Sequence, residues 1–169
     1  GIHGNNFTLR RVEITGTVDG VKVFGDNASV QDSWIHDLAY FASDPNQGGG
    51  PTHNDAIQVQ GGNNTVITGN NLAGTSAYNA AMQVTQDWNV TSNLRFAGNW
   101  VDGGMCSVNL ANKSRPPMQG IVVDGNKFSK TTWVPGCALV QTSVPLTFTN
   151  NVWQDGTLPL PTVKTHASL

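Results

Sequence analysis

Short segments in which apolar and polar residues alternate recur along the chain, and such alternation predicts β-strands rather than helices. Segments of a first type begin with a small or acidic residue, at 19–23, 55–59, 80–84, 106–110 and, more loosely, 137–140. Segments of a second type follow a polar turn, and their apolar anchors are Leu9, Val30, Ile67, Phe96, Val123 and Phe148. These anchors lie 21, 37, 29, 27 and 25 residues apart. A repeat of about 25 residues built from short strands predicts a parallel β-helix.

The predicted fold is therefore an all-β, right-handed parallel β-helix of about five to six coils, with three short strands in each coil. Its handedness follows the general preference for right-handed crossovers. We expect one domain over 1–169, with coils at 5–155 and a C-terminal extension at 156–169. Because the strand pattern is already under way at Gly1, we also expect further coils upstream. The side chains predicted to point inward are Val21, Val23, Ile57, Val59, Met82, Val84, Val108 and Leu110 on one face, and Ile67, Phe96, Val123 and Phe148 on a second.

A polar residue, usually Asn, stands in the same slot after each second-type segment. The members are Ser33, Asn70, Asn99, Asn126 and Asn151. Asn in the same slot of successive coils predicts a column of side-chain amides that bond to one another. An antiparallel sandwich or barrel is the alternative, and that fold does not require the recurrence.

The two cysteines fall in the same register. Cys106 and Cys137 begin equivalent segments in consecutive coils, which predicts Cα atoms near enough for a disulfide. Two buried, stacked thiols are the alternative. A bridge suits a secreted protein.

Composition narrows the possible partners. Charged residues make up 12% of the 169 residues and the net charge is -2, so the chain has no basic footprint for nucleic acid. No apolar run reaches the roughly 18 residues that a membrane span needs. The chain also shows no charged-then-apolar leader, so we expect any secretion signal to lie outside this sequence. We expect a secreted monomer.

Inserts interrupt the repeat, and function is commonly grafted onto a solenoid at such places. The longest, 36–53, carries His36, Tyr40, Phe41 and His53. The inserts 111–117 and 129–137 supply Arg115 and Trp133. The outward positions of the first segment type form one polar stripe: Lys22, Gln58, Gln83 and Asn109. Amides beside aromatic rings are typical of an oligosaccharide site.

Each of these features also has a purely structural interpretation. The stripe is also compatible with an amide ladder, in which the side chains form their hydrogen bonds with one another. His53 is compatible with a cap on the turn at Asn54. Asp19 and Asp55, which stand at the start of successive segments, are compatible with turn residues that accept backbone N–H bonds.

The repeat resembles the right-handed parallel β-helix proteins of the pectate-lyase-like superfamily over residues 5–155. The resemblance implies the fold, but that superfamily includes lyases, hydrolases, epimerases, tailspikes and adhesins. Its familiar signatures, Asp-Pro-His-Glu and Asn-Thr-Asp, are absent from the sequence. No catalytic residue is therefore transferred from the family.

The favoured interpretation is an extracellular polysaccharide lyase or hydrolase acting in a groove along the sheet. A lyase would use His53 or Lys22 as base, with Lys22 or Arg115 neutralising the sugar carboxylate. A hydrolase would need two carboxylates. The candidates are Asp19 and Asp55, at the shorter carboxylate spacing that is typical of retaining glycosidases. Mutual repulsion would raise the pKa of one of them. We expect Asp55 to point outward beside Gln58.

We expect no certain cofactor, although calcium between the two carboxylates is possible. The other residues expected to bind the polysaccharide are Gln83, Asn109, Tyr40, Phe41, His36, Trp133 and Arg115. One alternative is a non-catalytic carbohydrate-binding or adhesive module of a larger secreted protein. Another is a tailspike-type oligomerisation segment, which would need an exposed apolar stripe that the pattern does not indicate.

Overall fold

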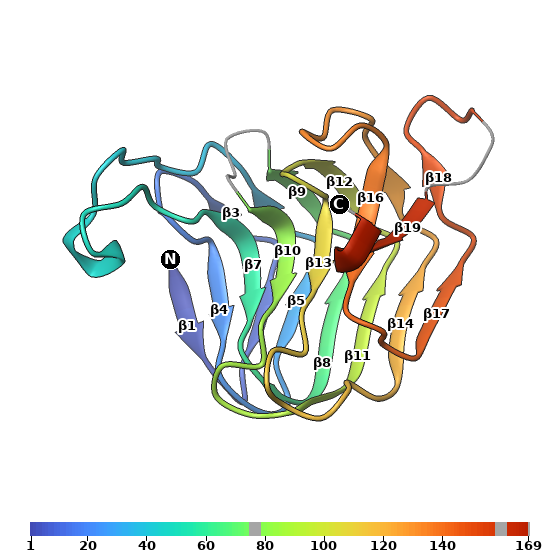
Figure 1. Cartoon of the computed structure of the whole chain (residues 1–169), viewed down its shortest axis with the longest axis horizontal. Coiled ribbons are helices and arrows are strands. Elements are labelled where there is room, and N and C mark those ends of the chain that lie inside the picture. Colours follow the sequence, from blue (N-terminus) through green and yellow to red (C-terminus); the bar gives the residue numbers. More distant parts are fainter. Residues whose placement is uncertain (75–78, 158–161, 169) are drawn as a thin grey trace.

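The chain folds into a parallel β-helix of six coils, in which each strand pairs with its counterpart in the next coil. The computed structural model describes residues 1–74, 79–157 and 162–168. Sheet A contains β1 (Ile2–Gly4), β4 (Val21–Val23), β7 (Asp55–Val59), β10 (Ala80–Val84), β13 (Val108–Leu110), β16 (Cys137–Gln141) and β19 (Thr162–Thr165). Its strands lie side by side across the front of Figure 1.

Two further sheets close each coil. Sheet B contains β2 (Thr8–Arg10), β5 (Ser29–Gln31), β8 (Gly62–Thr68), β11 (Thr91–Ala97), β14 (Ile121–Asp124) and β17 (Leu146–Thr149). Sheet C contains β3 (Glu13–Ile14), β6 (Trp34–Ile35), β9 (Asn71–Gly74), β12 (Trp100–Gly103), β15 (Lys127–Phe128) and β18 (Val152–Trp153). The helical elements of the described residues are two 3-10 turns, η1 (Pro45–Gln47) and η2 (His166–Ser168). No helix among these residues is long and apolar enough to cross a membrane.

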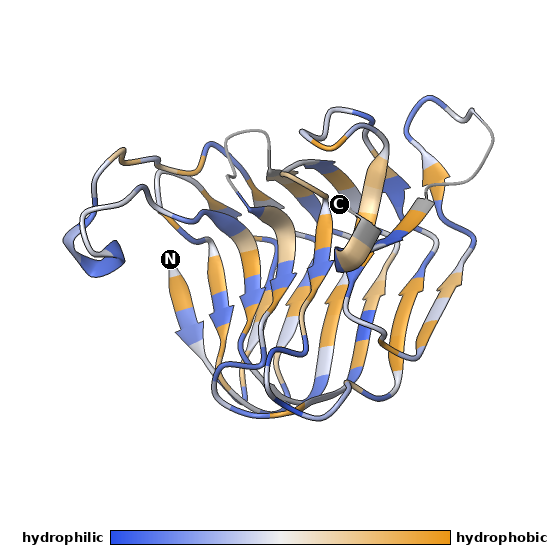
Figure 2. Ribbon diagram, viewed as in Figure 1, coloured by the Kyte–Doolittle hydropathy of each residue, from blue (hydrophilic) through white to orange (hydrophobic). Residues whose placement is uncertain are grey.

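The inward side chains form one continuous core. All eight residues predicted to point inward from sheet A are fully buried, and so are Ile67, Phe96 and Val123 of sheet B. Phe148 is only partly buried, in the last strand of its sheet, where it packs against Phe128. The alternating bands in Figure 2 follow this arrangement, because successive side chains of a strand point to opposite faces.

A column of buried amides runs along the corner between sheets B and C. The Asn70 side chain accepts the Ser33 amide at 3.0 Å and donates to Asn99 Oδ1 at 3.0 Å and to the Val30 carbonyl at 2.9 Å. Asn99 and Asn126 repeat this pattern with the following coil. Asn99 and Asn126 therefore use both hydrogens and both lone pairs of their amides, while Asn70 uses both hydrogens and one lone pair. These bonds confirm the predicted column.

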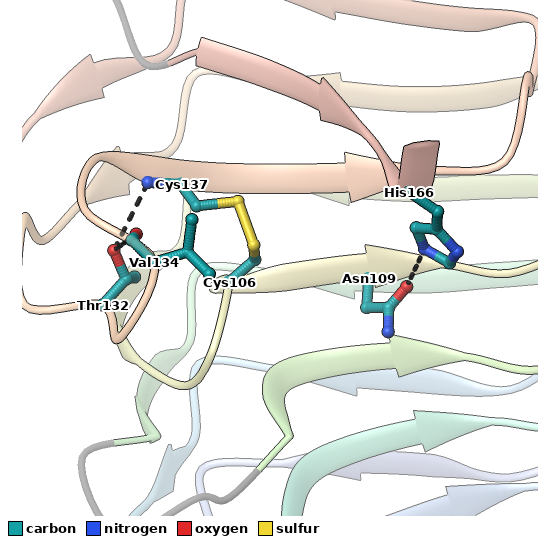
Figure 3. Close-up of a disulfide and its surroundings, with 6 residues drawn as sticks. All are labelled: Cys106, Asn109, Thr132, Val134, Cys137 and His166. Atoms are coloured by element: carbon teal, nitrogen blue, oxygen red, sulfur yellow. Dashed lines mark hydrogen bonds between the residues drawn. A yellow bond between two sulfur atoms is a disulfide. The ribbon is translucent and has the colours of Figure 1, made fainter. Parts of the chain in front are cut away.

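The disulfide is confirmed. Cys106 and Cys137 are bridged with their Cα atoms 4.8 Å apart, and both residues are buried. Val134 packs against the bridge, and Thr132 accepts the Cys137 amide with its hydroxyl (Figure 3). The bridge thus joins neighbouring coils at the start of β16.

The column yields a matched test of stability. Asn70 is buried within it, whereas its neighbour Asn71 points outward and is exposed. Because Asn70→Ala leaves buried donors and acceptors unpaired, we expect it to lower the free energy of unfolding by about 1–3 kcal/mol. Asn71→Ala should change it by less than about 0.5 kcal/mol. Equal losses for the two variants in urea unfolding would show that the column contributes nothing specific.

Candidate functional site

The outer face of sheet A carries a row of side chains at equivalent positions in all seven strands. Strand pairing aligns His3, Lys22, Gln58, Gln83, Asn109, Val140 and Lys164. These residues point outward because the positions on either side of them along β4, β7, β10 and β13 are apolar and fill the core. Adjacent members are separated by the strand spacing of about 4.8 Å.

A polar groove of about 310 Å³ lies over the middle of this row. It brings together five predicted site residues, which are Asp19, Lys22, His53, Gln58 and Gln83. The long insert reaches the groove through Gln47, which was not predicted, and through His53. The remaining lining residues are Gln60, Asn79, Thr85, Asp87 and Lys113.

Both ammonium groups of the groove lining are paired with aspartates. Lys22 Nζ lies 2.8 Å from Asp19 Oδ2. Lys113 pairs with Asp87, which also accepts the Thr85 hydroxyl at 2.6 Å. Partial burial acts against ionisation of Asp87, but the bonds from Lys113 and Thr85 outweigh it and lower the pKa of this carboxyl below its ordinary value. The two pairs leave this part of the groove with little net charge.

The amides of the groove form a short network held by an indole. Trp88 Nε1 donates to Gln60 Oε1 at 2.9 Å, and Gln60 Nε2 donates to Gln58 Oε1 at 3.1 Å. The Trp88 ring is 67% exposed and meets Phe24 edge-on, with the centroids 5.9 Å apart. Phe24 and Trp88 therefore form an aromatic rim beside the amide network, next to the residues that line the groove rather than among them.

The row is not a self-satisfied amide ladder. Gln58 accepts a hydrogen bond from Gln60, two residues further along the chain, and has no bond to Gln83 of the next coil. Gln83 Oε1 is buried and has no hydrogen-bond partner among the described residues. The outer face of sheet A thus differs from the corner column, in which the side-chain amides bond from one coil to the next.

Asp55 does not face the groove, and the expectation that it points outward is wrong. Asp55 has the same parity along β7 as Ile57 and Val59, and its exposed fraction is 0%. Its Oδ1 accepts the Ala80 amide at 3.1 Å, while its own amide donates to Asp19 Oδ1 at 2.9 Å. Asp19 and Asp55 therefore act as capping residues that join the starts of successive strands, which was the structural alternative.

The environment of Asp55 raises its pKa well above the ordinary value. Burial is the main cause and the nearby Asp19 carboxylate the second, opposed by bonds from the Ala80 amide and Asn79 and by the charge of Lys22. The direction agrees with the prediction of one raised pKa, but the buried carboxyl is not available to a ligand. A retaining pair of accessible carboxylates is thus not formed by Asp19 and Asp55. No group of three His, Cys, Asp or Glu side chains within 1–74, 79–157 and 162–168 is arranged to hold a metal ion.

Three predicted binding residues lie near the groove without lining it. Asn109 continues the row, but its Oδ1 is bonded to His166 Nε2 at 2.9 Å, so η2 covers it (Figure 3). Tyr40 and Phe41 are exposed near the base of the insert, where Thr52 bonds the Phe41 backbone in both directions. Neither ring lines the groove, although both were expected to bind the ligand.

The other three belong to different parts of the surface. His36 lies at the end of β6 in sheet C, and its ring nitrogens are bonded to Glu13 at 3.0 Å and Asp37 at 2.7 Å. His36 and Asp37, although adjacent in the sequence, are therefore bonded to each other through their side chains. Trp133 is exposed on the loop before the disulfide. Arg115 donates to the backbone carbonyls of residues 86, 87 and 88, so it fixes the loop that carries Asp87 and Trp88.

Sequence reasoning missed the loop 85–90, which delivers Asp87 and Trp88 to the site. The signal was present, because β7 and β8 are joined by two residues whereas β10 and β11 are joined by six. A lengthened turn with a tryptophan at the end of an outward row indicates a site as strongly as the longer inserts do. The insert 111–117 supplies Lys113 as well as Arg115, and Lys113, which was not assigned to the site, is the one that lines the groove.

Protein-family models, curated proteins and solved structures were all searched, and none matches the chain. The case for a function therefore rests on the geometry of the groove.

The pKa shift of Asp55 predicts a pH dependence of stability. A carboxyl whose pKa is raised by folding binds its proton more tightly in the native state, so its contribution falls as pH rises from about 3.9 towards the folded value. Asp55→Asn keeps an oxygen for the Ala80 amide and cannot ionise. We expect the variant to be more stable than the parent at neutral pH, with a flatter profile across that interval in urea unfolding.

Asp87→Asn is the matched control. The folded pKa of Asp87 is lowered, so its charged form stabilises the protein above the unfolded pKa, and its removal should destabilise at neutral pH. Destabilisation by Asp55→Asn at neutral pH would contradict the assignment of a buried carboxyl with a raised pKa.

Proposed function

We propose that the protein binds a polysaccharide chain in the groove along the outer face of sheet A. The observation that carries the proposal is the group of groove-lining amides at Gln58, Gln60 and Gln83, beside the exposed ring of Trp88. Amides bond sugar hydroxyls, while an indole packs on the apolar face of a sugar ring. The groove runs across the strands, so a linear chain would meet one coil after another.

The charges of the groove favour a neutral glycan over a uronic acid polymer. Lys22 and Lys113 are each paired with a carboxylate, Asp19 and Asp87. A sugar carboxylate entering the groove would compete with those two aspartates for the same cations. Neutral hydroxyls need no such exchange, and they can accept from the amides and donate to the Asp–Lys pairs without breaking them.

Binding without catalysis is the better-supported form of the proposal. A hydrolase would need two accessible carboxylates, and Asp55 is buried with its oxygen on a backbone amide. A lyase would need a cation free to neutralise the substrate, and Arg115 is bonded to three backbone carbonyls instead. We therefore favour the carbohydrate-binding module over the enzyme.

Secretion and membership of the pectate-lyase-like superfamily are part of the same proposal. The disulfide supports an oxidising compartment, and the parallel β-helix is compatible with the superfamily. Neither feature distinguishes a binding module from an enzyme, so the biochemical test addresses both activities.

The test compares Trp88→Ala with Trp133→Ala, two exposed tryptophans on different loops. Soluble pectin, alginate, glycosaminoglycan and neutral oligosaccharides are titrated by calorimetry. In parallel, the incubated glycans are assayed for new reducing ends and for the ultraviolet absorbance of unsaturated products. We expect a neutral glycan to bind without being cleaved. Trp88→Ala should weaken that binding about tenfold, corresponding to about 1.4 kcal/mol, since it removes the stacking ring and releases Gln60.

Trp133→Ala should leave the affinity unchanged. A glycan-cleaving activity that persists through purification of the protein and is lost in Lys22→Ala would show that the protein is an enzyme and not a binding module. Equal affinity of the parent and Trp88→Ala would show that the groove is not the glycan-binding site.

A further inference from the structure

The outer face of sheet C carries a second row of exposed side chains, on a different side of the coil from the groove. Strand pairing aligns one residue from each coil, in the order Glu13, Trp34, Asn71, Trp100, Lys127 and Val152. Their inward neighbours are Ile14, Ile35, Leu72, Val101, Phe128 and Trp153, all buried. The register therefore fixes two tryptophans in one outward line, with an asparagine between them. The alternation of apolar and polar positions in the sequence did not indicate an exposed apolar stripe, and neither ring was predicted to belong to a site.

Trp34 presents one ring face to solvent. Its indole is stacked on the His36 imidazole, with the centroids 3.6 Å apart and an angle of 16° between the planes. The His36 side chain is only 11% exposed, whereas Trp34 is 46% exposed. The imidazole thus occupies the covered side of the indole and is itself held by Glu13 and Asp37. This arrangement fixes the plane of an exposed aromatic ring.

Trp100 is positioned in a comparable way two strands further on. Its ring is 47% exposed, and the Lys127 ammonium lies 4.7 Å from its centroid. A cation over an indole at this distance is an attractive contact that restricts the ring. Both rings of the row are therefore exposed and oriented by a neighbouring side chain.

A hollow of about 510 Å³ lies next to Trp34 and supplies polar groups around the ring. Its lining includes the Glu13 carboxylate, the Asn71 amide and the charged side chains of Arg11 and Asp32. An aromatic wall with carboxylate, amide and guanidinium groups beside it is a suitable environment for a sugar ring, which has apolar faces and a belt of hydroxyls.

We propose that Trp34, Asn71 and Trp100 form a second glycan-binding site, which takes an extended, equatorially linked polysaccharide such as a β-1,4-linked glucan or N-acetylglucosamine polymer. Trp34 and Trp100 are two coils apart, which is about 10 Å at the strand spacing. This separation is close to the length of a disaccharide unit in such chains. Every second sugar of the chain presents the same ring face, so sugars one and three stack on the two indoles while sugar two meets Asn71.

The charged surroundings favour a glycan over a second copy of this chain. The centre of a protein–protein interface is depleted of charged residues, yet Glu13, Arg11, Asp32 and Lys127 all border the two rings. Two tryptophans spaced along a single row also offer far less area than the roughly 800 Å² a side that a specific interface buries. A polymer of sugar rings requires only the rings and the hydroxyl partners next to them.

The experiment measures how affinity depends on the length of the ligand. Cello-oligosaccharides and chito-oligosaccharides of one to six units are titrated against the full chain by calorimetry, and binding to insoluble cellulose and chitin is measured by depletion. We expect a rise in affinity of at least tenfold between the disaccharide and the trisaccharide of one of the two series, because three units are needed to reach both rings. Trp34→Ala and Trp100→Ala should each abolish that rise, whereas Trp34→Tyr and Trp100→Tyr, which keep a ring, should preserve part of it.

Trp88→Ala distinguishes this site from the groove of the proposed function. Its length dependence should equal that of the parent, even if a groove ligand is lost. No binding of either series would overturn the proposal, and so would a length dependence that survives both alanine substitutions or disappears in Trp88→Ala. A dimer or trimer in sedimentation that dissociates in Trp34→Ala and Trp100→Ala would overturn it in favour of an oligomer interface.

Discussion

The buried amide column is the interaction on which the rest of this structure depends. A parallel coil must turn sharply between sheets B and C, and the turn leaves backbone N–H and C=O groups away from water. Asn70, Asn99 and Asn126 satisfy these groups coil by coil, each bonding a backbone amide, a backbone carbonyl and the next side chain. A buried polar group without a partner costs about 1–3 kcal/mol. A shift of one coil against the next would therefore destabilise the fold at each Asn of the column. The column thereby fixes the register of the whole solenoid.

Fixed register converts a one-dimensional sequence into straight rows on the surface. On sheet A the row presents lysine and amides beside an aromatic rim, and on sheet C it presents two tryptophans separated by an asparagine. The spacing along both rows is set by the backbone and not by the side chains themselves. A repeat fold of this kind can therefore place chemical groups at multiples of one distance, which matches the regular spacing of units in a linear polymer.

The fold was predictable because its signals are local and repeated. The apolar anchors, the Asn slot and the positions of Cys106 and Cys137 all recur with the coil, so each occurrence supports the others. The site was less predictable. Asp55 was expected outside, although its parity with Ile57 places it inside, and a capping role for Asp19 and Asp55 needed the actual hydrogen bonds to recognise. Insert loops follow no period, so nothing in the sequence indicated that Gln47 rather than Tyr40 would reach the groove, or that Arg115 would secure the loop of Trp88.

The disulfide has a consequence for how the molecule comes apart. A solenoid is stabilised mainly by contacts between neighbouring coils, so it can fray inward from either end, one coil at a time. The Cys106–Cys137 bridge ties the start of β16 to the coil before it. Local unfolding from the C-terminal side is therefore limited at that bridge. The coil of β16 can lose its hydrogen bonds, but the disulfide keeps it next to the preceding coil, so it can refold against that coil. Resistance to proteolysis in an oxidising environment is thus unequal along the axis, with the bridged coils protected by rapid reclosure.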